Sequence, residues 1–229
     1  MTYSRYAVYY LPTDANLAKF GATWLGWDVE RGQAVSQFDV HGLPEATQTP
    51  ARYGFHATLK PPFRLAEVRE MDQLLAECGR LGAHLAPIRF EGLELAAIGN
   101  FLALVPTKNS DDVARLAEAC VRQLDGFRAP LSERELFRRR EVGLSKRQDK
   151  LLEQWGYPFV MEEFRFHLTL TGSLPAEAVD HWAEIARRFL GDTPKPFVID
   201  TIALCGERSD GRFEQITRYP LGGKVKKIA

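Results

Sequence analysis

The sequence predicts an α+β protein in which one supersecondary unit occurs twice, so that two related lobes face a shared cleft. Three observations predict this fold. The motif Phe-His-x-Thr-Leu occurs at residues 55–59 and again at residues 166–170. In both places it is followed by a helical pattern and then by two strand patterns. The length of 229 residues suits one large domain, or two small lobes that share a core.

The first half of the chain opens with an apolar, aromatic strand at residues 5–12, and Asp14 can cap a helix through residue 25. Residues 26–51 show little periodicity and are expected to form a long irregular connection. The remaining elements expected in this half are a strand at 54–61, a helix at 66–82, and a hairpin of strands 88–99 and 101–107 that turns at Gly99-Asn100.

The second half begins with a helical pattern at residues 110–127, followed by a polar, arginine-rich stretch at 128–144. Ser145 and Gln148 have the spacing of a capping box, which predicts a helix from 145 to 156. A strand at 163–172, a helix at 175–191 and a hairpin at 197–221, turning at Asp210-Gly211, complete the expected elements.

The two halves align on the two histidines. Phe101 begins a strand 45 residues after His56, and Phe213 begins a strand 46 residues after His167. This spacing indicates an internal repeat of a β-α-β-β unit. We therefore predict a single domain over residues 1–229, with two pseudo-symmetric lobes at roughly 1–108 and 109–229.

Both motif strands show the same alternation of faces. In the first, Gly54, His56, Thr58 and Lys60 share one face. In the second, the shared face carries the residues Arg165, His167, Thr169 and Thr171. The opposite faces are apolar and are expected to pack on the helix of the lobe. Each motif thus presents a histidine beside a threonine, with a cation nearby.

A single histidine on a strand is most often structural, but its recurrence with the same threonine and the same following helix favours a function. Two histidines in one cleft can act as base and acid, and two threonine hydroxyls can bind the oxygens of a phosphate between them. This is a metal-free way to cleave a phosphodiester. A zinc site fits less well, because each motif supplies one histidine and no carboxylate on its face.

The stretches RYGFHATLKPPF (52–63), WGYPFV (155–160) and FRFHLTLTG (164–172) resemble the 2H phosphoesterase superfamily, and within it the branch found with bacterial phosphonate-degradation genes. The resemblance implies two lobes with antiparallel sheets around a central cleft. It also implies that His56 and His167 are catalytic and that Thr58 and Thr169 hold the phosphate. The genomic association suggests a cyclic ribose phosphate as substrate.

Further candidates are weaker. Lys60 is predicted to contact the phosphate, with a solvent-exposed strand end as the alternative. Tyr53, Tyr157, Arg138, Arg139 and Arg165 are candidate substrate contacts, although aromatic residues are more often core and charge runs are more often solvated.

Lysine plus arginine and aspartate plus glutamate both number 30, so the formal net charge is zero. This argues against long nucleic acid as a partner and leaves an RNA end open. No signal peptide, membrane span, metal or cofactor is expected. Three scattered cysteines, Cys78, Cys120 and Cys205, are interpreted as reduced core residues, which suggests the cytoplasm. We also expect a monomer.

The function predicted from these features is a metal-independent hydrolase of a small cyclic or linear phosphodiester. Two alternatives stay open. The first is a 2′,3′-cyclic phosphodiesterase or 2′,5′ ligase that acts on RNA ends. The second is a protein that binds a phosphorylated ligand without turnover.

Overall fold

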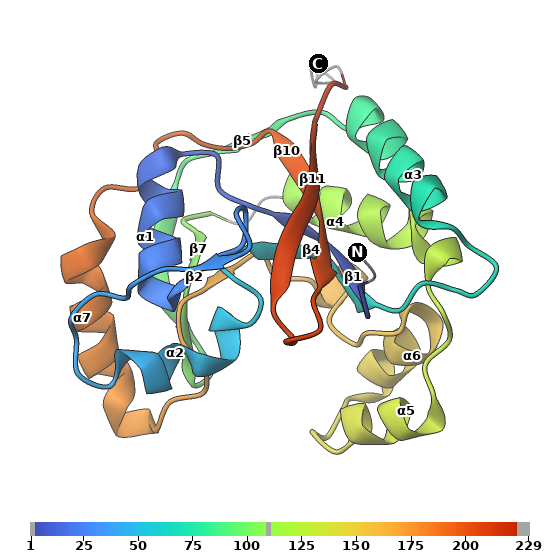
Figure 1. Cartoon of the computed structure of the whole chain (residues 1–229). Helices are drawn as coiled ribbons and strands as arrows, with labels where there is room; N and C mark the ends of the chain where they lie inside the picture. Colours follow the sequence, from blue (N-terminus) through green and yellow to red (C-terminus); the bar gives the residue numbers. More distant parts are fainter. Residues whose placement is uncertain (1–2, 109–110, 224–229) are drawn as a thin grey trace.

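Two antiparallel sheets form the centre of the computed structural model, which describes residues 3–108 and 111–223 (Figure 1). One sheet has four strands in the order β11-β10-β1-β4, and the other has three in the order β6-β7-β8. Short ladders join β2 to β3 and β5 to β9. The strands are β1 (Tyr6–Tyr10), β2 (Trp27–Asp28), β3 (Gln33–Ala34), β4 (Ala57–Phe63), β5 (Ile88–Phe90), β6 (Leu93–Ile98), β7 (Phe101–Pro106), β8 (Leu168–Thr169), β9 (Phe197–Ile199), β10 (Thr201–Glu207) and β11 (Phe213–Pro220).

Helices flank both sheets, so the predicted α+β class is confirmed. The helices are α1 (Ala15–Leu25), α2 (Leu43–Ala51), α3 (Met71–His84), α4 (Asp111–Gln123), α5 (Glu133–Arg140), α6 (Lys146–Trp155) and α7 (Val179–Leu190). The caps predicted at Asp14 and Ser145 form, whereas Ser110, the expected N-cap of the helical pattern at 110–127, lies outside the described residues. The Asp14 carboxylate accepts a hydrogen bond from Leu17 N at 2.8 Å, and Ser145 and Gln148 make a reciprocal capping box.

Two stretches expected to be irregular are helical. The connection at 26–51 contains α2, which begins with a proline at its second residue, where no backbone donor is needed. The arginine-rich stretch contains α5, whose start is closed by a capping box between Ser132 and Glu135. Both helices lack a strong apolar periodicity, and this is why the sequence pattern did not reveal them.

The repeated unit is present, but its two copies exchange parts. The first copy runs β4-α3-β5-β6-β7 and the second runs β8-α7-β9-β10-β11. Hairpin β6–β7 pairs with β8 of the second copy, whereas hairpin β10–β11 joins the sheet that contains β4. The predicted lobes at 1–108 and 109–229 are therefore wrong, because each sheet draws strands from both halves.

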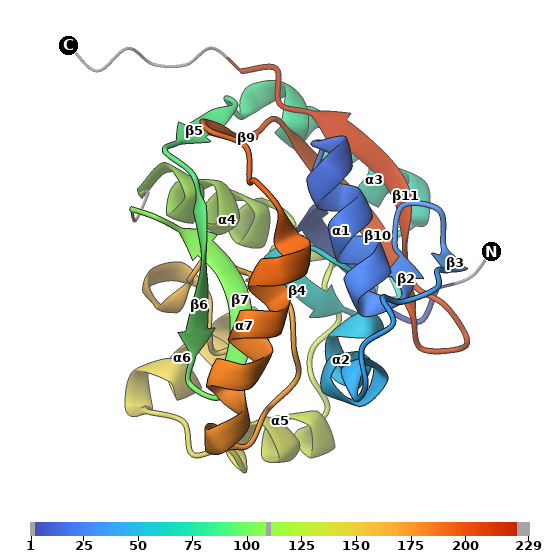
Figure 2. The same cartoon turned by 90° about the vertical axis from the view of Figure 1, so that its left-hand side faces the viewer.

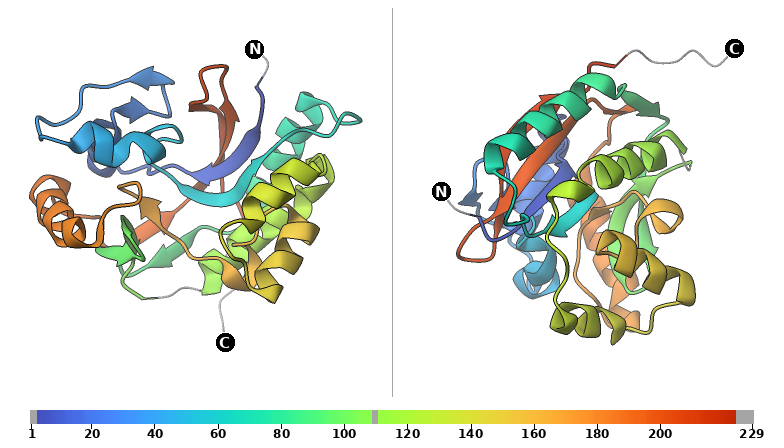
Figure 3. Two further views of the ribbon diagram at one scale, coloured as in Figure 1. Left: turned by 90° about the horizontal axis from the view of Figure 1, so that it is seen from below. Right: turned by 90° about the vertical axis from the view of Figure 1, so that its right-hand side faces the viewer.

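The helices follow the same exchange. Helix α3 of the first copy packs on β10 and β11 of the second, and the right panel of Figure 3 shows it lying along these strands. Helix α7 of the second copy packs on β6 and β7 of the first (Figure 2). Each hairpin is thus covered by the helix of the other copy, and the exchange ties the two halves into one folding unit.

The four-stranded sheet has apolar side chains on both faces. On β1, Tyr6, Val8 and Tyr10 point into the main core, while Ala7 and Tyr9 join a second cluster with Trp27, Val29 and Phe213 on the other face. Cys78, Cys120 and Cys205 are buried free thiols, as predicted. Within the described ranges, none of the helices combines the length and apolar character needed to cross a bilayer.

Candidate active site

Both motif histidines make the same local hydrogen bond. His56 Nδ1 lies 2.8 Å from the carbonyl oxygen of Gly54, and His167 Nδ1 lies 2.7 Å from that of Arg165. In each case the partner is the residue two positions earlier, just before the strand begins. Because a carbonyl oxygen only accepts, each Nδ1 must carry the proton. In the neutral form, each Nε2 is then the free base.

Gly54 shapes the approach to His56. Its φ of 74° is in the left-handed region, and a Cβ at this position would lie 2.5 Å from Cβ of Val29. Only glycine fits both the dihedral angle and the space. The glycine thereby places its carbonyl where it can orient the imidazole of His56.

His56 rests against the second apolar cluster. Its ring stacks on Tyr9 with centroids 3.7 Å apart and an interplanar angle of 28°. Burial is the main cause that lowers the pKa of His56 to about 4; the hydrogen bond to Gly54 opposes this shift, and the positive charge of His167 adds to it. His56 is neutral at physiological pH.

His167 occupies the equivalent position in the other sheet. Its ring centroid lies 5.8 Å from that of Phe101, the first residue of β7. Burial lowers the pKa of His167, whereas the hydrogen bond to the Arg165 carbonyl raises it. Both histidines are half-buried. They are thus held in apolar surroundings that favour the neutral imidazole but leave part of each ring accessible.

The two threonines accompany the histidines, but their bonding differs. Thr58 of β4 pairs with Tyr9 of β1. The Thr58 hydroxyl lies 3.0 Å from Nε2 of His56, to which it can donate a hydrogen bond. Thr169 pairs with Ala103 across β7. Among the described residues, Thr169 makes no such bond to His167. Both threonines are half-buried, so their hydroxyls could bind a ligand.

Lys60 does not share the face of His56, so its predicted placement is wrong. Adjacent residues Val8 and Tyr9 pair with Lys60 and Thr58, which leaves one extra residue in β4. This β-bulge breaks the alternation on which the prediction rested. Lys60 is 2% exposed, and its Nζ donates to the carbonyl oxygen of Val121 at 3.1 Å, near the end of α4. Lys60 thus stabilises a helix C-terminus, where a cation is favourable.

Of the predicted substrate contacts, Tyr53 lies beside His56, and Arg139 lies against Tyr157. The ring centroid of Tyr53 is 6.3 Å from that of His56, and the guanidinium of Arg139 lies 5.1 Å from the ring centroid of Tyr157. Burial raises the pKa of Tyr157, whereas the positive charge of Arg139 lowers it. Arg138 is exposed and borders the same pocket as Arg139, whereas Arg165 is exposed beside His167.

The sequence reasoning missed Arg5 and Tyr9. Arg5 makes a two-pronged ion pair with Glu207, with Nε 2.7 Å from Oε2, and it borders the pocket that contains Arg139. Tyr9 is fully buried beneath His56. A signal was present, because Arg5, Ala7 and Tyr9 alternate on one face of the predicted strand.

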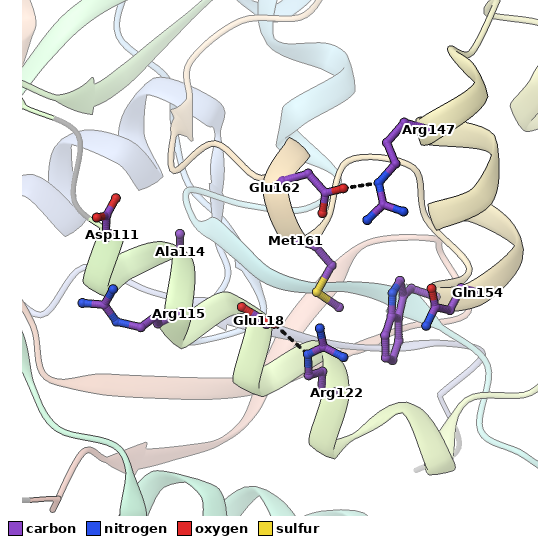
Figure 4. Close-up of a pocket in the computed structure, with 10 residues that line it drawn as sticks. Asp111, Ala114, Arg115, Glu118, Arg122, Arg147, Gln154, Met161 and Glu162 are labelled. Carbon is purple, nitrogen blue, oxygen red and sulfur yellow. Dashed lines mark hydrogen bonds and ion pairs between the residues drawn. The ribbon is translucent and has the colours of Figure 1, made fainter.

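A separate surface hollow lies away from the histidine strands. It is bordered by α4, α6 and the segment around Met161 and Glu162. Its cations are paired, since Arg122 Nε bonds the Glu118 carboxylate at 2.7 Å and Arg147 bonds Glu162 (Figure 4). With its charges already neutralised within the protein, this hollow is not the candidate site. Within the described part of the chain, no three His, Cys, Asp or Glu residues are arranged to hold a metal ion.

A model of the family described as "Protein of unknown function (DUF1045)" matches residues 58–214. The chain belongs to this family. The match includes His167 and both threonines and begins two residues after His56. The matched region therefore contains the second motif and most of the exchanged fold.

Two curated relatives are similar to this DUF1045 chain, and both are named "Ribose 1,5-bisphosphate phosphokinase PhnN". The one from Janthinobacterium sp. (strain Marseille) is 35% identical and covers 99% of this chain. The one from Laribacter hongkongensis (strain HLHK9) is 34% identical and covers 93%. The chain spans about half the length of these relatives, 52% and 51% respectively.

Solved structures also match nearly the whole chain. TT0787 of Thermus thermophilus has a TM-score of 0.47 and 15% identity, covering 96% of this chain and 100% of its own. LigT of E. coli, complexed with phosphate, has a TM-score of 0.47 and 13% identity, covering 96% and 99%. A structure titled only as a phosphoesterase has a TM-score of 0.46 and 12% identity, covering 95% and 98%.

Proposed function

We propose that this DUF1045 protein is a phosphodiesterase that opens a small cyclic phosphodiester by acid/base catalysis with His56 and His167. The observation that carries the proposal is the repeated Nδ1 hydrogen bond. It orients both imidazoles in the same way and leaves Nε2 of each for proton transfer. A purely structural histidine would not require this bond, with the same partner spacing, in both copies of a repeat.

The two histidines have different roles in this proposal. His56, with the pKa of about 4, is neutral and takes a proton from water as the water oxygen attacks phosphorus. The bond between phosphorus and one ring oxygen breaks, and that oxygen receives the Nε2 proton of His167 in its imidazolium form. The product is a phosphate monoester and a free hydroxyl. Proton exchange with solvent then restores both histidines.

Thr58 and Thr169 are proposed to donate hydrogen bonds to the non-bridging oxygens of the phosphate. In the free protein, the Thr58 hydroxyl is already bonded to His56 Nε2 at 3.0 Å. Binding of the phosphate would draw this hydroxyl away and release Nε2 to accept a proton from water. Donors aimed at the developing charge typically contribute about 10²–10³-fold to the rate.

A cyclic ribose phosphate is the substrate that we propose. Cleavage of a ribose 1,2-cyclic phosphate between phosphorus and O2 leaves the phosphate on carbon 1, as in the substrate named for the curated relatives. This chain lacks the G-x-x-x-x-G-K-[ST] loop through which many kinases hold nucleotide phosphates. We therefore infer that the kinase activity named for the relatives belongs to the part of them that this chain does not match.

A turnover assay in EDTA tests the proposal. The purified protein is offered ribose 1,2-cyclic phosphate, 2′,3′-cyclic AMP and a short RNA with a cyclic phosphate end, and products are identified by ³¹P NMR. We expect turnover of the ribose compound that survives EDTA and falls by at least about 10²-fold in His56→Ala and in His167→Ala.

His84→Ala is the matched control. His84 also has its Nδ1 bonded to a backbone carbonyl, at 2.7 Å from Arg80 O, but it is exposed at the end of α3. This variant should keep full activity. Turnover that is indifferent to both motif histidines, or lost in EDTA, would refute the mechanism. Faster turnover of the RNA would move the substrate to RNA ends, and binding without turnover would indicate a ligand-binding protein.

A further inference from the structure

A second pocket is unusually rich in positive charge. It lies between the end of β4, helix α5 and the segment at Tyr157, and its free volume is about 20 Å³, so a bordering side chain such as the exposed Arg138 must shift to admit a phosphate. One carboxylate, that of Glu135, borders it. The six cationic side chains that border it are Arg5, Lys60, Arg64, Arg128, Arg138 and Arg139.

Four of these cations already have carboxylate partners. Arg128 and Lys60 pair with Asp125 at 2.8 Å and 3.7 Å, and Arg64 pairs with Glu135 at 2.8 Å. Arg5 pairs with Glu207, as described above. Within residues 3–108 and 111–223, no carboxylate lies within salt-bridge distance of Arg138 or Arg139. The pocket therefore has two cations that a ligand could neutralise.

Of the two arginines, Arg139 gives the stronger indication of a bound ligand. Its Nε is buried and has no hydrogen-bond partner among the described residues. Burial lowers the pKa of Arg139, and the charges of Arg138 and Arg5 lower it further. Keeping this guanidinium charged in the pocket therefore costs free energy of folding. A buried donor of this kind is normally satisfied. The ring of Tyr157 makes a cation–π contact with the guanidinium, but it gives Nε–H of Arg139 no hydrogen-bond acceptor.

The pocket adjoins the histidines through two aromatic residues. Arg5 borders the pocket, and its guanidinium lies 5.7 Å from the ring centroid of Phe213, which stacks on Tyr53 with centroids 5.4 Å apart. Tyr53 in turn lies beside His56. A small substrate could therefore reach the histidines with one end and the arginines with the other.

We propose that this pocket binds a second phosphate group of the substrate, a phosphate monoester remote from the cyclic phosphate, with Arg139 and Arg138 as its ligands. The guanidinium fork matches the oxygen geometry of phosphate, and a dianion suits a pocket with two uncompensated cations. This inference rests on the proposed function for the identity of the rest of the substrate. It names the substrate class as sugar cyclic phosphates that carry a further phosphate.

A binding experiment tests the pocket without any need for turnover. Ribose 5-phosphate is titrated into the wild type, Arg139→Gln, Arg138→Gln and His167→Ala by calorimetry. We expect Arg139→Gln to weaken binding by about 10- to 100-fold, the range for lost charge-assisted hydrogen bonds, and Arg138→Gln to weaken it less. A loss of affinity in His167→Ala without a loss in Arg139→Gln would place the phosphate at the histidines and overturn the proposal.

Arg140→Gln is the control, because Arg140 is on the same helix but pairs with Asp149 and Glu153, both at 2.6 Å. It should bind like the wild type. Equal binding by wild type and Arg139→Gln, or equal losses in Arg139→Gln and Arg140→Gln, would overturn the proposal. If Arg139→Gln fails to fold, judged by its circular dichroism, the exposed Arg138→Gln decides: unchanged binding in that variant would also overturn it.

A kinetic comparison then separates this inference from the proposed function. The substrates are ribose 1,2-cyclic phosphate with and without a 5-phosphate. We expect the wild type to prefer the 5-phosphorylated compound by about 10- to 100-fold in kcat/KM, and Arg139→Gln to lose this preference while still cleaving the other. If ribose 5-phosphate binds in an Arg139-dependent way but no substrate is turned over, the phosphate-binding role of the pocket stands and the proposed enzyme activity is refuted. Turnover without a preference for the 5-phosphorylated substrate would support the enzyme activity and refute the phosphate-binding role of the pocket.

Discussion

At the scale of residues, the main finding is that two histidines in different sheets share the same local bonding and are both shifted toward the neutral form. The carbonyls of Gly54 and Arg165 select the same tautomer in each. Burial lowers both pKa values, and that of His56 reaches about 4. A site with two neutral imidazoles has a ready base, but it must acquire a proton to have an acid.

This proton requirement predicts a pH optimum on the acid side of neutrality. kcat/KM should rise with pH through about 4, as His56 loses its proton and becomes a base. It should fall as His167 loses its proton, at a pH below the ordinary histidine value of about 6.5. The measurement is kcat/KM for the cyclic substrate from about pH 3.5 to about pH 9, which brackets both titrations. A rate that is highest at the alkaline end of this range would contradict this assignment of acid and base.

At the scale of elements, strand β4, which directly follows His56, depends on its neighbours for position. Helix α1 approaches the start of β4 so closely that a Cβ on Gly21 would lie 1.9 Å from Cδ1 of Phe55. Phe55 is buried and directly precedes His56. The bulge in β4 is the other local feature, since it keeps Thr58 on the histidine face and turns Lys60 toward α4.

The close approach of α1 predicts that Gly21→Ala is destabilising. The added methyl group must displace Phe55, which should lower the free energy of unfolding by about 1–3 kcal/mol. Because Phe55 adjoins His56, kcat/KM should fall as well. Gly79→Ala on α3 is the control: its Cβ would meet Tyr219 at an ordinary 3.5 Å, and alanine should gain about 0.5–1 kcal/mol. Denaturant melts check both; equal effects would show that the contact with Phe55 is unimportant.

At the scale of the whole molecule, the exchange of hairpins makes the two halves interdependent. Strand β4 belongs to a sheet completed by β10 and β11, and β8 belongs to a sheet completed by β6 and β7. Both motif strands are therefore supported by pairing partners far away in sequence. In the proposed mechanism, one histidine beside each sheet acts on the same phosphate.

This interdependence predicts that the chain cannot be divided at its sequence midpoint. Residues 1–108 alone would expose an edge of β1 and the buried faces of β6 and β7, so we expect no cooperative unfolding transition. Residues 109–229 alone should behave likewise. Circular dichroism of each fragment in increasing urea is the measurement, with the full chain as reference. A cooperative transition in either isolated fragment would show that the exchanged contacts are dispensable.

The second motif strand, predicted at 163–172, is only Leu168–Thr169. Local signals were enough to predict the first motif strand and the caps of two helices, and they identified the two histidines and their threonines as candidates. In each of these, a residue type and a short spacing carry the physical cause. The exchange of hairpins, the bulge that turns Lys60 inward and the pocket shared by Arg5 and Arg139 became visible only in the folded chain. Strand pairing, register and long-range charge contacts depend on residues that lie far apart in sequence, and no spacing within a single stretch encodes them.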